Sequence, residues 1–323
     1  MAKYGSASVA FFLVDGLNLL GYSTDLSDGK EALTEDVQAL GDIWPKPIPT
    51  GTKKAEFAQA GYYDDETDGI HQALNEQQGV SRVLCFGYAT NAIGKPFGGF
   101  AGAYAQKYAR LTSRNGLHKA NAAYEISGAA DDGVILHELS EEAGDYDGTG
   151  ADSHDTADET FIPAIAVTSS SVGNPSVITC SSPHGITTGE KVVIAGHAGS
   201  TPSLNGEQVA TVISATTFSV PVNVTAGGTS GAVKRVATAN GASGYLQVTA
   251  ITLSGRPSVT IKIRHSADDA TYADLITFTA VTARGAERKT VAGTVNRHLA
   301  TSVTWGGAGG SPKVTYLVGL ARS

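Results

Sequence analysis

The chain has 323 residues, of which 41% are hydrophobic and 17% are charged, and its formal net charge is −8. This composition excludes an intrinsically disordered chain, which has few apolar residues, and a coiled coil, which is dominated by Ala, Glu, Lys, Leu and Arg. No run of about 18 apolar residues predicts a membrane span, and the two cysteines, Cys85 and Cys180, are expected to be buried free thiols.

Residues 1–140 are predicted to form strands and one helix. The dipeptide Asp15-Gly16 between two apolar runs predicts a β-hairpin. The stretch 68–79 predicts the helix, capped by Asp68 and ended by a glycine. The apolar stripe of this helix consists of Ile70, Ala73 and Leu74. Residues 100–113 and 117–128 predict two long antiparallel strands, because an Asn-Gly pair between strands is a strong turn signal. Their turn consists of Arg114, Asn115 and Gly116.

Two stretches of contrasting composition follow. Residues 141–160 are rich in Asp and Glu and contain no Lys or Arg, and without hydrophobic periodicity they predict a solvated acidic linker. Residues 161–237 contain short β-branched segments separated by Gly, Ser and Thr turns, which predicts a small all-β module.

The C-terminal region, residues 238–323, is predicted to be a further β domain. Its segment 258–266 alternates between apolar and polar residues, which is typical of a strand with one buried face, and 287–305 predicts one long strand. Residues 55–74 and 260–275 show a faint similarity, because in each a strand leads to an Asp-Asp pair. Such repetition is expected if one fold is present twice.

Charge is divided unevenly along the chain. Residues 1–160 contain 25 acids and 11 bases, a balance of −14, whereas residues 161–323 contain 6 acids and 12 bases, a balance of +6. If copies of the chain contact one another, opposite charges of this kind can set their register and orientation.

The sequence contains no motif that predicts catalysis, metal binding or a cofactor. It has no Walker loop, no G-x-G-x-x-G motif and no histidine pair at the i, i+4 spacing of a helical zinc site. Acid pairs such as Asp64-Asp65 and Asp131-Asp132 are more typical of turns than of glycosidase carboxylates. We therefore expect a non-enzymatic protein, with a glycan hydrolase as the least favoured alternative.

Three parts of the chain together resemble the major tail tube proteins of long, non-contractile-tailed (siphovirus-type) bacteriophages. They are 61–76 (GYYDDETDGIHQALNE), 181–220 (beginning SSPHGITTGE), and 261–281 followed by 287–305. The resemblance implies a tail-tube fold for residues 1–140, a β-sandwich or barrel with one flanking helix and a long hairpin. It also implies that 161–237 is an inserted, outward-facing module and that 238–323 is either a second tube domain or a decoration.

The resemblance also implies a function. Tube subunits form rings whose hairpins join into an inner barrel, and the rings stack into the virion tail after assembly in the host cytoplasm. DNA passes through the lumen without specific binding, and the tape measure, tail tip and terminator proteins are the other expected partners. On the strand 117–126, the face expected to line the lumen carries Lys119, Asn121 and Glu125.

Two questions stay open at the level of sequence. Two tube domains per chain imply a trimeric ring with pseudo-sixfold symmetry, which the similarity and the charge division favour, whereas one tube domain implies a hexameric ring. The alternative function is a tail or capsid decoration or adhesin protein that binds host surface glycans.

Overall fold

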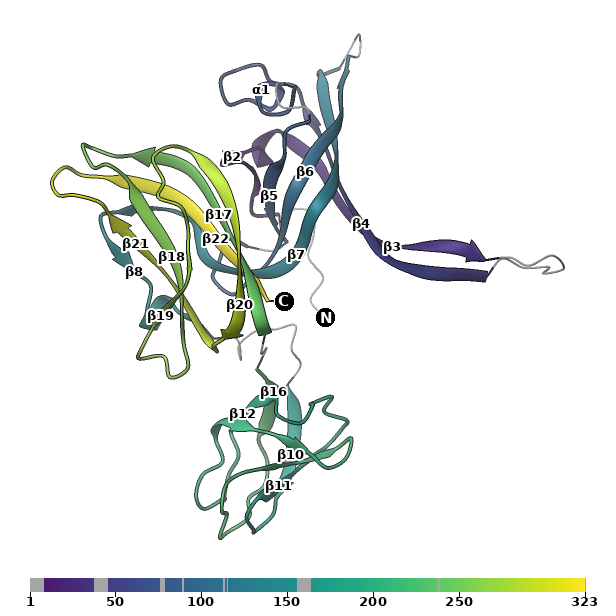
Figure 1. Ribbon diagram of the computed structural model, residues 1–323, viewed down its shortest axis with the longest axis vertical. Coiled ribbons are helices and arrows are strands. Elements are labelled where there is room, and N and C mark those ends of the chain that lie inside the picture. Colours follow the sequence, from purple (N-terminus) through teal and green to yellow (C-terminus); the bar gives the residue numbers. More distant parts are fainter. Residues whose placement is uncertain are drawn as a thin grey trace.

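The computed structural model describes residues 9–37, 46–75, 79–88, 90–112, 114, 116–155, 164–236 and 239–322. The protein is mainly β, with sheets of ten, seven and five strands (Figure 1). The described helices are the α-helix α1 (Ile70–Asn75) and two short 3-10 helices, η2 (Leu20–Tyr22) and η3 (Gly150–Asp152).

The ten-stranded sheet joins the two ends of the chain. Its order is β2-β1-β5-β6-β7-β22-β17-β20, with β4 paired to β7 and β3 paired to β4. The strands are β1 (Phe12–Val14), β2 (Leu17–Asn18), β3 (Ser23–Val37), β4 (Lys46–Tyr62), β5 (Arg82–Gly87), β6 (Pro96–Leu111), β7 (Lys119–Ala143), β17 (Ala239–Thr252), β20 (Gly285–Val295) and β22 (Lys313–Arg322). The first part of β7 pairs with β4 and β6, and its last part pairs with β22. One continuous strand therefore belongs to both the N-terminal and the C-terminal region.

The five-stranded sheet packs on the C-terminal side of this large sheet. Its strands are β8 (Tyr146–Asp147), β9 (His154–Asp155), β18 (Val259–Ser266), β19 (Ala273–Thr277) and β21 (His298–Trp305). The predicted alternation in β18 is confirmed, because Val259, Ile261 and Ile263 are fully buried in the core that the two sheets share.

Residues 164–236 form the seven-stranded sheet, which has a core of its own. Its order is β13-β12-β16-β10-β11-β15-β14. The strands are β10 (Ile165–Ser170), β11 (Ser176–Cys180), β12 (Lys191–Ala195), β13 (Gly206–Val209), β14 (Thr211–Val212), β15 (Thr217–Val220) and β16 (Ala232–Arg235). Figure 1 shows these strands, in teal to green, below the two other sheets.

Local predictions near the N-terminus have mixed outcomes. The hairpin at Asp15-Gly16 is confirmed, since β1 pairs with β2 and both turn residues have positive φ angles, 48° and 81°. The prediction that Asp68 caps the helix is wrong. Its carboxylate instead accepts a hydrogen bond from Arg284 at 2.6 Å, which lowers the pKa of Asp68. Both cysteines are free and buried, as predicted.

The predicted acidic linker is wrong for residues 141–155. β7 continues to Ala143, and β8 and β9 pair with β21 of the C-terminal region. Basic residues far along the chain compensate the acids, as in the Lys313–Glu141 ion pair at 2.6 Å. Residues 156–160 lie outside the described residues.

The expected long strand over 287–305 is also wrong. It is two strands, β20 and β21, which belong to different sheets. The similarity between 55–74 and 260–275 does not extend to structure, because β4 leads to α1 whereas β18 leads to a turn and then to β19. In that turn the Asp268 carboxylate accepts hydrogen bonds from the backbone N–H groups of Ala270 and Thr271.

Candidate assembly surface

Four strands of the large sheet, in the order β3-β4-β7-β6, bury only one of their two faces. In β4, Phe57 and Gln59 are buried, whereas Glu56 and Ala58 are exposed. The buried face packs against α1, whose side chains Ile70, Ala73 and Leu74 are all buried. The other face has no described element packed on it, and we call it the open face.

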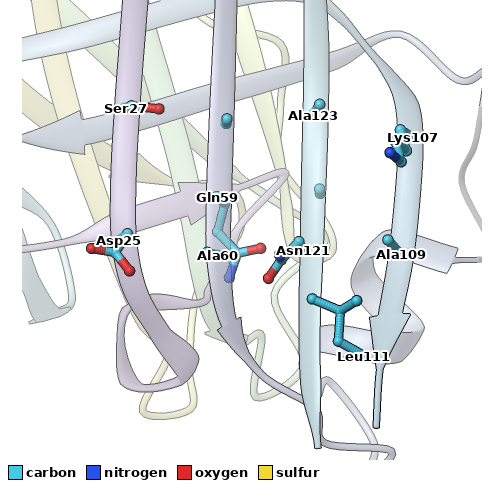
Figure 2. Close-up of a pocket in the computed structure, with 11 residues that line it drawn as sticks. Asp25, Ser27, Gln59, Ala60, Lys107, Ala109, Leu111, Asn121 and Ala123 are labelled. Atoms are coloured by element: carbon cyan, nitrogen blue, oxygen red, sulfur yellow. The ribbon is translucent and has the colours of Figure 1, made fainter.

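Small and polar side chains line the open face in rows that cross the strands. The backbone register places Asp25, Ala60, Asn121 and Ala109 in one row. The next row contains Ser27, Ala58, Ala123 and Lys107. Figure 2 shows these residues around a shallow depression of about 350 Å³. Because the side chains of these two rows are alanines or polar groups, this part of the face is suited to water rather than to a second core layer.

The structure places the residues predicted for the lumen together. Lys119, Asn121 and Glu125 occupy alternate positions of β7 on the open face, where Lys119 is exposed and the other two are partly exposed. Glu125 also accepts a hydrogen bond from Gln106 of the neighbouring strand. The lumen itself is a property of an assembly, so the role of these residues stays a proposal.

The predicted hairpin turn and helix flank the same sheet. Arg114 and Gly116 lie in the connection between β6 and β7, and Asn115 lies outside the described residues. On the buried face, the Tyr108 hydroxyl of β6 is 2.8 Å from Nδ1 of His71 in α1, and burial raises the pKa of this tyrosine. The helix is therefore tied to the sheet by a polar contact as well as by its apolar stripe.

Sequence reasoning missed β3 and the first half of β4. Beyond the Lys30–Ala55 pair, these two strands pair only with each other and form a two-stranded arm that extends from the body in Figure 1. No described element packs on either side of the arm. An alternation of apolar and polar residues is therefore not required there. That alternation is the signal by which a half-buried strand is found in a sequence.

Both outer strands of the open sheet have free edges in the part of the chain that the structure describes. β3 pairs with β4 alone. β6 pairs with β5 only over Phe97–Ala103, so the outer edge of Tyr104–Leu111 meets no described strand. Unpaired edges of this length present rows of free N–H and C=O groups, which other strands can pair with.

The open face carries charges of both signs. Its acids are Asp25, Glu56 and Glu125, and its lysines include Lys107 and Lys119. Across the described ranges, no three His, Cys, Asp or Glu side chains are grouped so that they could hold a metal ion. Within the same ranges, no helix is long and apolar enough to span a membrane.

Comparisons with known proteins give only distant similarities. No protein-family model and no curated protein matches the chain. A chain of the virion of the native gene transfer agent particle is 13% identical, with a TM-score of 0.31, over 40% of this chain and 98% of that one. A chain of the tail of the empty gene transfer agent particle is 16% identical, with a TM-score of 0.30, over 40% and 97%.

A third solved structure matches over nearly the whole length. The SPP1 Dit (gp 19.1) protein, a hub of the adsorption apparatus in phages that infect Gram-positive bacteria, is 8% identical over 97% of this chain and 98% of its own, with a TM-score of 0.29. TM-scores at this level do not establish a shared fold.

Proposed function

We propose that this protein is a structural subunit of a bacteriophage tail tube, whose copies form stacked rings that conduct the genome into the host. The observation that carries the proposal is the open sheet β3-β4-β7-β6, on which the described residues form a core on one face only and leave an edge free on each side. When such sheets join edge to edge into a barrel, every edge is paired. The sequence resemblance to phage tail tube proteins supports the same function.

In such a barrel the open face lines the bore, because α1 and its core cover the opposite face. A large barrel encloses a water-filled channel when its inward side chains are polar and leave space. Among the described residues of this face, the lysines are interspersed with Asp25, Glu56 and Glu125 and form no basic stripe that would hold the phosphate backbone of DNA. This arrangement suits passage of DNA without specific binding.

We further propose a ring of six copies, in place of the trimer that the sequence favoured. The described chain contains one open sheet. One tube domain per chain implies a hexameric ring, so this number supports the proposal. β17 carries buried residues on both faces, since Leu246 belongs to the C-terminal core and Tyr245 to a cluster with Phe97 and Leu317. The C-terminal region is therefore suited to be a decoration outside the barrel, as we propose also for residues 164–236.

Electron microscopy of the purified full-length protein tests the proposal. We expect rings or tubes with an open bore, and discrete monomers with glycan affinity would instead support an adhesin. In assembled tubes, a cysteine at Asn121 should react with a small thiol reagent and be protected from a reagent too bulky for the bore. A cysteine at Val172, which is 65% exposed in the outer module, is the matched control and should react with both.

The adhesin alternative has less support from the surface. A polar depression of about 390 Å³ lies on the five-stranded sheet, where a glycan would meet hydrogen-bonding groups. Its charged groups are already paired with one another, however, since Lys262 contacts Asp274 at 2.7 Å and Arg264 contacts Asp147 at 3.0 Å. A sugar would have to compete with these ion pairs for the same donors and acceptors.

A further inference from the structure

We propose that the seam between neighbouring copies pairs β3 of one copy with the Tyr104–Leu111 part of β6 of the next, and that Asp25 and Lys107 attract each other across it. This inference rests on the tube-subunit function proposed above and adds the identity of the two contacting edges. The partner is a second copy of this chain.

Strand direction makes the pairing regular. β3 is antiparallel to β4, β4 to β7, and β7 to β6, so β3 and β6 run in opposite directions at the two sides of the open sheet. When a second copy is placed beside the first by a rotation about the ring axis, its β3 runs antiparallel to β6 of the first. The antiparallel alternation then continues from copy to copy without interruption.

The two edges also match in extent. β3 is backed by the four-stranded sheet over Ser23–Lys30, because that stretch pairs with the part of β4 that contacts β7. The free part of β6 is Tyr104–Leu111, which has the same number of residues. A seam of this length adds a row of backbone hydrogen bonds at each subunit contact.

The two edges carry opposite charge. Asp25 and Asp28 are exposed on β3, and the one base of the stretch Ser23–Lys30, Lys30, is already paired with Asp132 at 2.6 Å. Lys107 and Arg110 are exposed on β6, and the stretch Tyr104–Leu111 contains no acid. None of these four exposed side chains has an ion-pair partner in the described chain.

These charges select the way in which copies meet. Pairing β3 with β3, or β6 with β6, places like charges along the seam, whereas pairing β3 with β6 places opposite charges there. The first two contacts are self-complementary and stop at a dimer, while the third is head-to-tail and can close into a ring. Figure 2 shows Asp25 and Lys107 on the two outer strands of the open sheet. Both side chains lie on the open face.

Charge exchange tests the seam. Asp25→Lys and Lys107→Asp should each raise the protein concentration at which half of the chains are assembled, by about tenfold or more, because an attraction becomes a repulsion at every contact. The double variant should restore assembly to near the wild-type concentration. Lys119→Asp is the matched control, since it makes the same charge change on the central strand β7 and should leave assembly unchanged.

Oxidative cross-linking gives a second measurement. Three strand spacings, or about 14 Å, separate Asp25 and Lys107 within one chain, so a disulfide between cysteines at these positions must join two copies. Asp25→Cys combined with Lys107→Cys should give a ladder of covalent oligomers, whereas Asp25→Cys combined with Lys119→Cys should give none.

The outcomes separate the two proposals. Restoration by the double charge exchange, together with the ladder, supports the seam. If rings form but neither the exchange nor the cross-link affects them, the seam is overturned and the tube function stands. If the wild-type chain forms no rings under any condition of assembly, the tube function is overturned and the seam with it.

Discussion

Replacing Phe57 with Ala should loosen the open sheet from the body of the protein. Phe57 is 1% exposed and projects from β4 into the N-terminal core. Its ring centroid is 5.2 Å from that of Phe12, 5.4 Å from Phe86 and 5.6 Å from Phe100. These neighbours come from β1, β5 and β6, so this one side chain holds the arm-bearing strand to three others.

The magnitude follows from complete burial. Truncation of a buried Phe to Ala costs about 3–5 kcal/mol, which combines the lost transfer free energy with the cavity that remains. This measured range already includes the loss of the three aromatic contacts, so we expect a loss of free energy of unfolding of about 4 kcal/mol. Because about 1.4 kcal/mol is a factor of ten, amides of β4 and β7 should exchange with solvent several hundredfold faster or more.

Hydrogen exchange on the unassembled chain measures this effect strand by strand. Amides of residues 164–236, which have a separate core, should keep their exchange rates in the variant. Glu56→Gln, one residue away on the exposed face, is the control and should change stability by less than ~0.5 kcal/mol. A change below about 1 kcal/mol for Phe57→Ala would refute the reasoning that this ring anchors the open sheet.

Three further outcomes are expected. Gly16→Ala should destabilise the fold by roughly 2–4 kcal/mol in denaturant titrations, because Gly16 has a φ of +81° and an added Cβ would lie 2.2 Å from the Val248 carbonyl oxygen. Burial lowers the pKa of His137, so the unfolded chain takes up this proton first. Stability should therefore be full above pH ~6.5 and decline below it, and His137→Phe should flatten that decline in melts across pH. Deleting 164–236 should leave ring formation intact by electron microscopy, and loss of assembly by a soluble, folded deletion variant would contradict an outward-facing module.

Sequence alone determined the features that depend on neighbouring residues. The Asp15-Gly16 hairpin follows from backbone angles that few residue types adopt readily, and the alternation in 258–266 identifies a strand with one buried face. The strands of residues 164–236 follow from β-branched runs between Gly, Ser and Thr turns. The face of β7 that carries Lys119, Asn121 and Glu125 was also readable, because side chains alternate in every strand.

Tertiary structure alone decided which partners these segments have. The acids of 141–155 predicted a linker because the bases that pair with them are more than a hundred residues away, as Lys313 is from Glu141. The arm of β3 and β4 left no pattern, since neither of its faces is buried by a described element. A local pattern of residues can show that one face of a strand is buried, but it does not record which distant strands and helices pack against that face.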